Sequence, residues 1–157
     1  MHEDVVIRKA RPADLAACAA IVVDEITSVS YLPDPPDLAE MIDIFEKAAA
    51  SGRHITVADR GGEIIGYTST EPRADMVPHL HALYLKPAHR EGGVGKRLLD
   101  AVKIDWPQGF ELTVFELNED AQRLYLREGL REIPKRRDDD TEEGVPTLLM
   151  VWDGEAA

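Results

Sequence analysis

The chain has 157 residues, of which 30 are acidic and 18 basic, giving a formal net charge of −12. This length predicts a single domain, residues 1–157, large enough to bury a core, while the acidic balance argues against a nucleic-acid partner bound through a basic surface. The longest apolar run is far short of a membrane span, and the charged N-terminal stretch lacks the apolar segment of a secretory signal, so we expect no membrane partner.

The first half of the chain predicts a strand, two helices and a hairpin. A strand is expected at Val5–Ile7, and apolar residues at three- and four-residue spacing over residues 15–26 indicate a helix. The single cysteine, Cys18, falls on the apolar face of that helix; we interpret it as core packing, and a lone cysteine favours a cytoplasmic location. A proline-rich break precedes a second helix capped by Asp37, and residues 54–71 are typical of two strands joined by a glycine pair.

The second half alternates strands and helices. We expect strands at His79–Leu85, 110–117, 131–137 and 147–153, helices at 94–102 and from the cap Asn118 to Gly129, and a solvated acidic loop at 138–146. A strand, a glycine-rich turn and a helix in succession predict at least one parallel crossover. The sequence therefore indicates a mixed α/β fold.

The glycine-rich turn follows the strand His79–Leu85 and reads "REGGVGKRLL". A phosphate-binding P-loop would need a glycine five residues before its Gly-Lys pair and a hydroxyl residue after it, and both are missing. A dinucleotide fingerprint would need a third glycine where Leu98 stands. The remaining pattern is Arg-x-x-Gly-x-Gly, formed by Arg90, Gly93 and Gly95, in which glycines and free N–H groups at a helix start can approach phosphate oxygens.

A second motif follows after one strand: Asn118-x-x-Ala121-x-x-Leu124-Tyr125-x-x-x-Gly129-Leu130. Together the two motifs resemble the GNAT superfamily of N-acetyltransferases, which transfer acetyl from acetyl-CoA to amines. The resemblance extends over nearly the whole chain and departs from the usual pattern at Leu130, where a phenylalanine is common. It implies a mostly antiparallel twisted sheet of six to seven strands flanked by about four helices, with the fourth and fifth strands splayed apart.

The resemblance also implies how acetyl-CoA would bind as a cosubstrate. In this superfamily the strand before the glycine turn binds the pantetheine arm through its backbone, the turn binds the pyrophosphate, and an asparagine of the later helix contacts the cofactor. The corresponding positions here are Leu83, Tyr84, Leu85, Arg90, Glu91, Gly92, Gly93, Val94, Gly95, Lys96 and Asn118. The reaction needs no metal, and the sequence shows no cluster of metal ligands.

Three residues are candidates for proton transfer. The resemblance makes Tyr125 the acid that protonates the departing thiolate. The segment "HLHAL" is similar to one in arylalkylamine N-acetyltransferases, in which a histidine pair relays the amine proton. Strand alternation predicts that His79, His81, Leu83 and Leu85 share one face, so we expect at least one histidine to act as a proton acceptor.

The leading interpretation is acetylation of a small-molecule primary amine through a ternary complex. Acetylation of a protein N-terminus or lysine, and a non-catalytic acyl-CoA sensor, remain alternatives. The superfamily resemblance places the acceptor pocket at the first two helices and the loop between the last strands, where Tyr31, Asp34 and Asp37 are candidates to meet a cation. It also suggests a homodimer.

Overall fold

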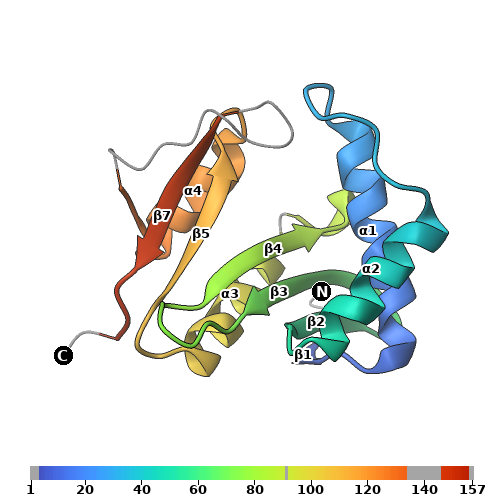
Figure 1. The fold of residues 1–157 in the computed structure, drawn as a ribbon, viewed down its shortest axis with the longest axis horizontal. Helices are drawn as coiled ribbons and strands as arrows, with labels where there is room; N and C mark the ends of the chain where they lie inside the picture. The colour runs from blue at the N-terminus through green and yellow to red at the C-terminus, as the bar shows by residue number, and fades with distance from the viewer. Residues whose placement is uncertain (1–3, 91, 134–145, 156–157) are drawn as a thin grey trace.

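The fold is a seven-stranded sheet covered by helices on both faces (Figure 1). The computed structural model describes residues 4–90, 92–133 and 146–155. Its elements are β1 (Val5–Lys9), η1 (Pro12–Asp14), α1 (Leu15–Ser28), α2 (Leu38–Ala50), β2 (His54–Arg60), β3 (Glu63–Glu71), β4 (His79–Leu85), η2 (Pro87–His89), α3 (Val94–Asp105), β5 (Phe110–Phe115), α4 (Glu119–Arg127), β6 (Arg131–Glu132) and β7 (Thr147–Trp152). Their order agrees with the sequence analysis.

The sheet runs in the order β1-β2-β3-β4-β5-β7-β6. All neighbouring strands are antiparallel except β4 and β5, which are parallel. The connection between those two strands is α3, as expected for a parallel crossover. The predicted mixed, mostly antiparallel sheet is therefore confirmed.

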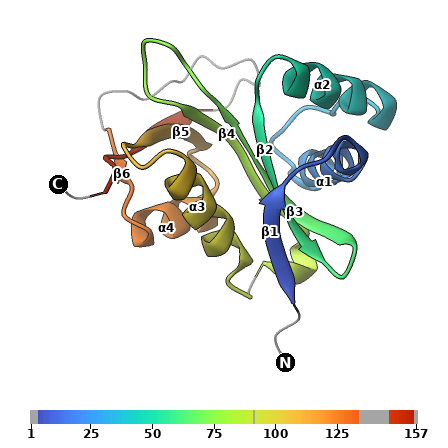
Figure 2. The ribbon, with the colours of Figure 1, turned by 90° about the horizontal axis from the view of Figure 1, so that it is seen from below.

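Helices α1 and α2 cover one face of the sheet, and α3 and α4 lie on the other (Figure 2). Their apolar faces define the core. On the first face, Cys18 of α1 and Phe45 of α2 belong to the same buried cluster as Val57 and Tyr67 of the sheet. The interpretation of Cys18 as a core residue is confirmed, and burial raises the pKa of its thiol to about 12.

Both predicted helix caps form. The Asp37 carboxylate accepts a hydrogen bond from the backbone N–H of Glu40 at 2.8 Å, and the Asn118 side-chain oxygen accepts one from the N–H of Ala121 at 3.2 Å. These bonds satisfy N–H groups that have no partner inside the helix. Asp37 is thus engaged in starting α2.

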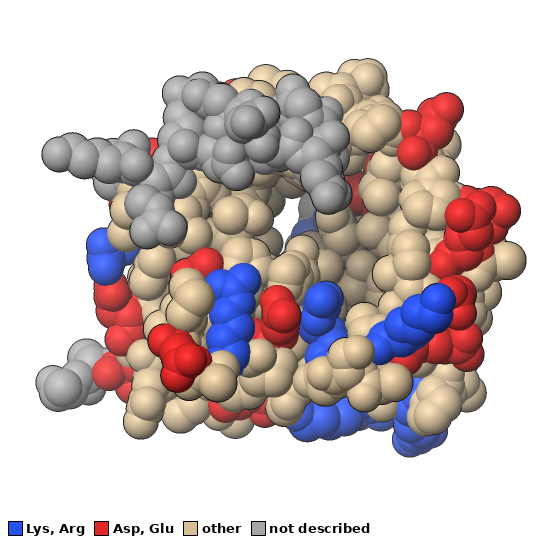
Figure 3. All heavy atoms as spheres, viewed as in Figure 1, with Lys and Arg blue, Asp and Glu red and all other residues tan. Residues whose placement is uncertain are grey.

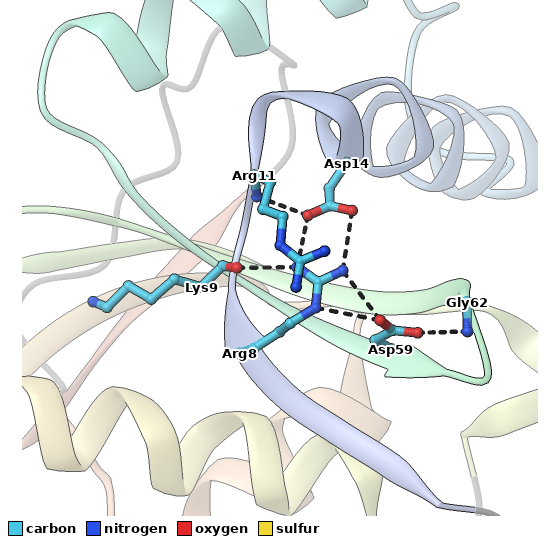
Figure 4. A network of polar contacts seen from close by, with 6 residues as sticks. All are labelled: Arg8, Lys9, Arg11, Asp14, Asp59 and Gly62. Atoms are coloured by element: carbon cyan, nitrogen blue, oxygen red, sulfur yellow. Dashed lines mark hydrogen bonds and ion pairs between the residues drawn. The ribbon is translucent and has the colours of Figure 1, made fainter.

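Arg8 on the edge strand β1 is the centre of a network of polar contacts near the start of the chain (Figure 4). Its guanidinium donates to the carboxylate of Asp14 at 2.7 Å and to that of Asp59 at 3.1 Å. Asp14 also accepts from the N–H of Arg11, and Asp59 accepts from the N–H of Gly62. One side chain therefore joins β1, the start of α1 and the β2–β3 hairpin.

The strand boundaries differ from the sequence expectations at four places, one of which is the last strand, expected at 147–153 and observed at Thr147–Trp152. The first strand continues to Lys9, because Arg8 and Lys9 still pair with β2. The fifth strand ends at Phe115, where its pairing with β7 stops. The strand expected at 131–137 is described only for Arg131–Glu132, and most of the expected acidic loop 138–146 lies outside the described residues.

The sheet opens between β4 and β5. These strands pair only through His79 with Glu111 and Leu80 with Leu112, and beyond that point they diverge (Figure 1). The space-filling view from the same side shows a hollow at the centre of this face (Figure 3). The splayed strand pair implied by the sequence is confirmed.

Within the described residues, no helix is both long and apolar enough to cross a bilayer.

Candidate active site

The two histidines lie at the vertex where β4 and β5 part. Their ring centroids are 4.6 Å apart with the planes inclined at 55°, so the sequence prediction of a histidine pair holds. The register with β3 joins Thr70 to Leu80 and Ser69 to Ala82, which leaves His81 as an extra residue in β4. Such a β-bulge interrupts the alternation of side chains along a strand.

The bulge makes the predicted common face of all four β4 side chains wrong, because Leu80 packs in the cluster with Leu99 of α3 while Ala82, two residues further on, packs on the α1 and α2 side. Beyond the bulge the alternation resumes. Leu83 and Leu85 pack in the cluster that contains Leu98 of α3. Ala82 and Tyr84 pack instead against the cluster on the α1 and α2 side. Simple alternation would have needed an unbroken register with β3, which the extra residue prevents.

His79 is nearly buried, with 8% of its surface exposed, and contacts the neighbouring strand. Its Nδ1 lies 2.9 Å from Oε2 of Glu111 on β5. Because an ionised carboxylate can only accept hydrogen bonds, Nδ1 is the protonated nitrogen and Nε2 is left with the lone pair.

His81 contacts a carboxylate on the other neighbouring strand, β3, and does so through its other ring nitrogen. Its Nε2 lies 2.7 Å from Oε1 of Glu71 on β3. Burial lowers the pKa of His81, and the hydrogen bond that its Nε2–H donates to Glu71 opposes that effect only in part. The His81 ring is therefore neutral at neutral pH and available to accept a proton.

Arg73, in the β3–β4 connection, joins the two carboxylates. Its Nη1 is 3.5 Å from Glu111, and its Nε is 3.9 Å from Glu71. The sequence analysis missed Arg73, Glu71 and Glu111. The two glutamates could have been found from the sequence because each lies near the end of a predicted strand. Both of those strands neighbour the strand that carries the two histidines.

Tyr125 is on α4, one of the two helices on the other face of the sheet (Figure 2). Only 7% of its surface is exposed, within the cluster that contains Leu80 and Leu112. Burial raises the pKa of Tyr125, and the phenol of Tyr84 on β4 raises it further. The hydroxyl is therefore protonated at neutral pH and can act only as a proton donor or hydrogen-bond partner.

The segment expected to bind the cofactor pantetheine, Leu83–Leu85, lines the opening along β4. Its three residues pair with Thr68, Tyr67 and Gly66 of β3. Beyond Leu80 the described ladder with β5 has ended, so the second edge of this strand faces the gap. Every second residue there directs its N–H and C=O groups toward the opening.

The glycine turn leads into α3, whose N-cap is Gly93 with a φ of +79°. This left-handed conformation favours glycine. A Cβ added at Gly92 or Gly93 would meet no atom within 4 Å, so the turn presents open space. Of the predicted phosphate-binding residues, Glu91 lies outside the described residues.

Gly95 has a different neighbourhood from the other two glycines. An added Cβ would lie 3.3 Å from Leu85 and 3.5 Å from Leu124. Its small size therefore allows α3 to pack closely against β4 and α4. Val94 is also buried, beside Leu98, and so belongs to the packing of the helix start.

The basic residues of the turn have partners within the protein. The Arg90 guanidinium donates to the carbonyl of Leu85 at 3.3 Å and pairs with the carboxylate of Glu25 on α1. Lys96 pairs with Asp100 at 2.8 Å, one helical turn further along α3. An anionic ligand at this turn would have to compete with both carboxylates.

A pocket of about 280 Å³ lies between the end of α1 and the start of α4. Its lining includes Glu25, Tyr31, Asn118, Glu119, Asp120 and Arg123. The structure thus brings Tyr31, an expected acceptor contact, next to Asn118, an expected cofactor contact.

Across the described ranges, no group of three or more His, Cys, Asp or Glu side chains could hold a metal ion.

Comparison with known proteins identifies the class to which this arrangement belongs. The model of the GNAT acetyltransferase family matches residues 20–130. This range contains β4, the glycine turn, α3 and Tyr125. The chain belongs to the GNAT acetyltransferase family.

Solved structures share the fold at low sequence identity. A phosphinothricin acetyltransferase from Sinorhizobium meliloti in complex with acetyl-CoA is 21% identical, with a TM-score of 0.76 over 98% of this chain and 91% of that one. A ribosomal-protein-alanine N-acetyltransferase from Brucella melitensis is 22% identical, with a TM-score of 0.72 over 93% and 98%. A GNAT acetyltransferase from Bacillus cereus is 18% identical, with a TM-score of 0.78 over 98% and 99%.

Proposed function

We propose that the protein is an acetyl-CoA-dependent N-acetyltransferase whose acceptor is the primary amine of a small molecule. The observation that carries this proposal is the opening between β4 and β5, with two partnered histidines at its vertex and Tyr125 in the same core cluster as Leu80 and Leu112, which pair at that vertex. The amine would attack the thioester directly, with both substrates bound at once.

The cofactor site of this proposal uses the β4 edge and the glycine turn. Acetyl-CoA supplies an activated acyl group and a chain of amides that can pair with an exposed strand edge such as Leu83–Leu85. The open space at Gly92 and Gly93 would admit a pyrophosphate close to the first N–H groups of α3. Arg90, Lys96 and Asn118 would add polar contacts from around the same opening.

The acceptor must lose a proton before it can attack. A primary amine with a pKa near ~10.4 is mostly protonated at neutral pH and has no lone pair to donate. In this proposal His79 and His81 take that proton, directly or through a water. The lowered pKa of His81 keeps its ring neutral and ready to accept.

The remaining steps concern the charges that develop at the acyl group. A backbone N–H on the open edge of β4 would stabilise the negative charge on the carbonyl oxygen. Tyr125, whose hydroxyl is in its acid form at neutral pH, would then protonate the departing thiolate and regain a proton from water. No metal enters this scheme.

The pocket beside Tyr31 bears on which class of acceptor the protein would take. The pocket beside Tyr31 contains the carboxylates of Glu25, Glu119 and Asp120, with Asp120 paired to Arg123. This acidic lining and the net charge of −12 favour the approach of a cationic amine. Two structures with the same fold are named for different acceptors, phosphinothricin and a ribosomal protein.

The test is a thiol-release assay with acetyl-CoA across a panel of small amines and peptides with free N-termini or lysines. We expect amine-dependent release with small primary amines. Release only with peptides would favour the protein-acetylating alternative. Acetyl-CoA binding by calorimetry without any turnover would favour the acyl-CoA sensor.

A further inference from the structure

The vertex of the sheet holds two carboxylate–imidazole pairs that use opposite ring nitrogens. Glu111 contacts Nδ1 of His79 at 2.9 Å, whereas Glu71 contacts Nε2 of His81 at 2.7 Å. An ionised carboxylate can only accept, so in each pair the nitrogen in contact with the carboxylate carries the hydrogen and, in the neutral ring, the other nitrogen has the lone pair. His79 is therefore left with a lone pair on Nε2, and His81 with one on Nδ1.

The two pairs differ in their exposure to water. The side chains of His79 and Glu111 are 10% and 17% exposed, whereas those of His81 and Glu71 are 35% and 45% exposed. A charge-assisted hydrogen bond is stronger where water competes less, and an exposed pair contributes little. The Glu111 contact is therefore the one that can hold a ring in a single tautomer.

Glu111 is itself held in place by its surroundings. It stands opposite His79 in the short parallel ladder, and its backbone N–H donates to the carbonyl of Pro78 at 3.0 Å. Arg73 approaches the same Oε2 atom that contacts His79, at 3.5 Å. The carboxylate is thus fixed by backbone on one side and by a cation on the other.

We propose that Glu111 is the positioning residue of the site: it holds the hydrogen of His79 on Nδ1, so that Nε2 is the atom that accepts the amine proton. This inference rests on the proposed function and names the base within it. The proton moves from the amine nitrogen to Nε2, no other bond to the ring changes, and the carboxylate of Glu111 balances the imidazolium charge until the proton leaves to solvent.

The pH dependence of this step reflects every charged group around the ring. These groups are Glu111 on β5, Glu71 on β3, Arg73 in the β3–β4 connection and His81 on β4 itself. Of the four, only Glu111 contacts His79 through a hydrogen bond. Removing the charge of Glu111 should therefore change the pH profile of kcat/KM more than removing the charge of a carboxylate in an ion pair away from the site.

The kinetic test compares Glu111→Gln with Asp153→Asn. Glutamine keeps an oxygen that can accept from Nδ1 but removes the charge, so we expect kcat/KM to fall about tenfold, with its lower limb moved toward lower pH and the KM for acetyl-CoA unchanged. Asp153→Asn removes an exposed carboxylate paired with Arg131 and should leave the profile as it is. A wild-type profile in Glu111→Gln would overturn the part of the inference in which the Glu111 charge balances the protonated His79 ring.

An independent readout does not require turnover. Long-range ¹H–¹⁵N correlation spectra of the imidazole nitrogens should show His79 protonated at Nδ1 in the wild type and in Glu111→Gln, with that preference lost in Glu111→Ala. A wild-type His79 protonated at Nε2 would overturn the inference whatever the activity. If no amine or peptide is acetylated, the proposed function and the catalytic part of the inference fail together, while these spectra still decide whether Glu111 orients the ring.

Discussion

Tyr125 is held in its acid form by its position on α4, where burial and the nearby Tyr84 both raise its pKa. A phenol in this state can donate a proton to a thiolate but cannot serve as a base at neutral pH. The distinction matters because the same side chain also fills space in the core cluster around Leu112. A test of its role must remove the proton and keep the ring.

We predict that Tyr125→Phe lowers kcat by roughly 10²-fold, the lower range for general acid catalysis, with little change in acetyl-CoA affinity. Phenylalanine preserves the packing, so the melting temperature should stay close to that of the wild type. The measurement is steady-state kinetics together with calorimetry of cofactor binding. A kcat within about threefold of the wild type would assign Tyr125 to packing.

The histidine pair predicts a specific pH dependence. As pH rises, deprotonation of the pair supplies the base, so kcat/KM should rise through an apparent pKa at or below ~6.5, the ordinary value for histidine. The lowered pKa of His81 places its contribution on the acid side of that value. Neighbouring rings titrate together, so the apparent value belongs to the pair.

Replacing both His79 and His81 with glutamine should abolish this lower limb while cofactor affinity is retained. Each single substitution should have a smaller effect than the double one, because a water or the partner ring can substitute, and His79→Gln should have the larger effect of the two because Nε2 of His79 is the proposed acceptor. The profile must be recorded with an amine whose own ionisation falls at clearly higher pH. Persistence of the lower limb in the double variant would place the base elsewhere.

At this scale the sequence predicted the contact between the two histidine rings better than the surroundings of those rings. The two-residue spacing of His79 and His81 is local, and so the ring contact could be anticipated. Glu71 and Glu111 come from neighbouring strands, and the register that brings them to the rings depends on a bulge at His81 that no alternation pattern shows.

Among the secondary-structure elements, the glycine turn that leads into α3 contains glycines in two different environments. Gly92 and Gly93 border open space, whereas Gly95 packs against Leu85 and Leu124. Within the turn, Gly92 and Gly93 therefore leave space for a ligand, whereas Gly95 allows α3 to pack closely on its neighbours. Substitutions along the turn should have different consequences.

We predict that Gly92→Glu weakens acetyl-CoA binding at least tenfold, about 1.4 kcal/mol, because it adds a negative charge and a side chain where the pyrophosphate would lie. Its melting temperature should be unchanged, since the side chain enters open space. Gly95→Leu is the matched comparison and should lower the melting temperature by pressing on Leu85. Equal affinity of Gly92→Glu and the wild type in calorimetry would remove the turn from the cofactor site.

The elements themselves were largely predictable because their signals are local. Asp37 and Asn118 cap α2 and α4 as expected, and the glycine pair turns the β2–β3 hairpin. The limits of β1 and β5 were missed by two residues each. Strand ends are set by pairing with a neighbour, in these cases β2 and β7, and the sequence of one strand does not contain that information.

For the whole molecule, the Arg8 network joins segments that are far apart in sequence. Arg8 binds both Asp14 and Asp59, and the two hydrogen bonds from Arg8 and Arg11 lower the pKa of Asp14. A carboxylate with a lowered pKa in the folded state stabilises the protein above its unfolded pKa. That contribution disappears as pH falls through the folded-state value.

We predict that Asp14→Asn lowers the melting temperature at neutral pH and that the difference from the wild type shrinks as pH falls below about 4. The asparagine retains the shape of the side chain but lacks the charge that Arg8 binds. Thermal unfolding followed at several pH values measures the effect. A difference that stays constant from neutral to acidic pH would show that the charge of Asp14 does not stabilise the fold.

The parting of β4 from β5 has a consequence for the backbone of the free protein. Along residues 82–85, alternate amides face β3 and are hydrogen-bonded within the sheet, while the others face the opening. Deuterium should therefore enter this one strand at two rates, with fast and slow positions alternating residue by residue. Coenzyme A, if it pairs with the open edge, should slow the fast set and leave the slow set as it was, so that a single strand reports by itself whether the gap is filled.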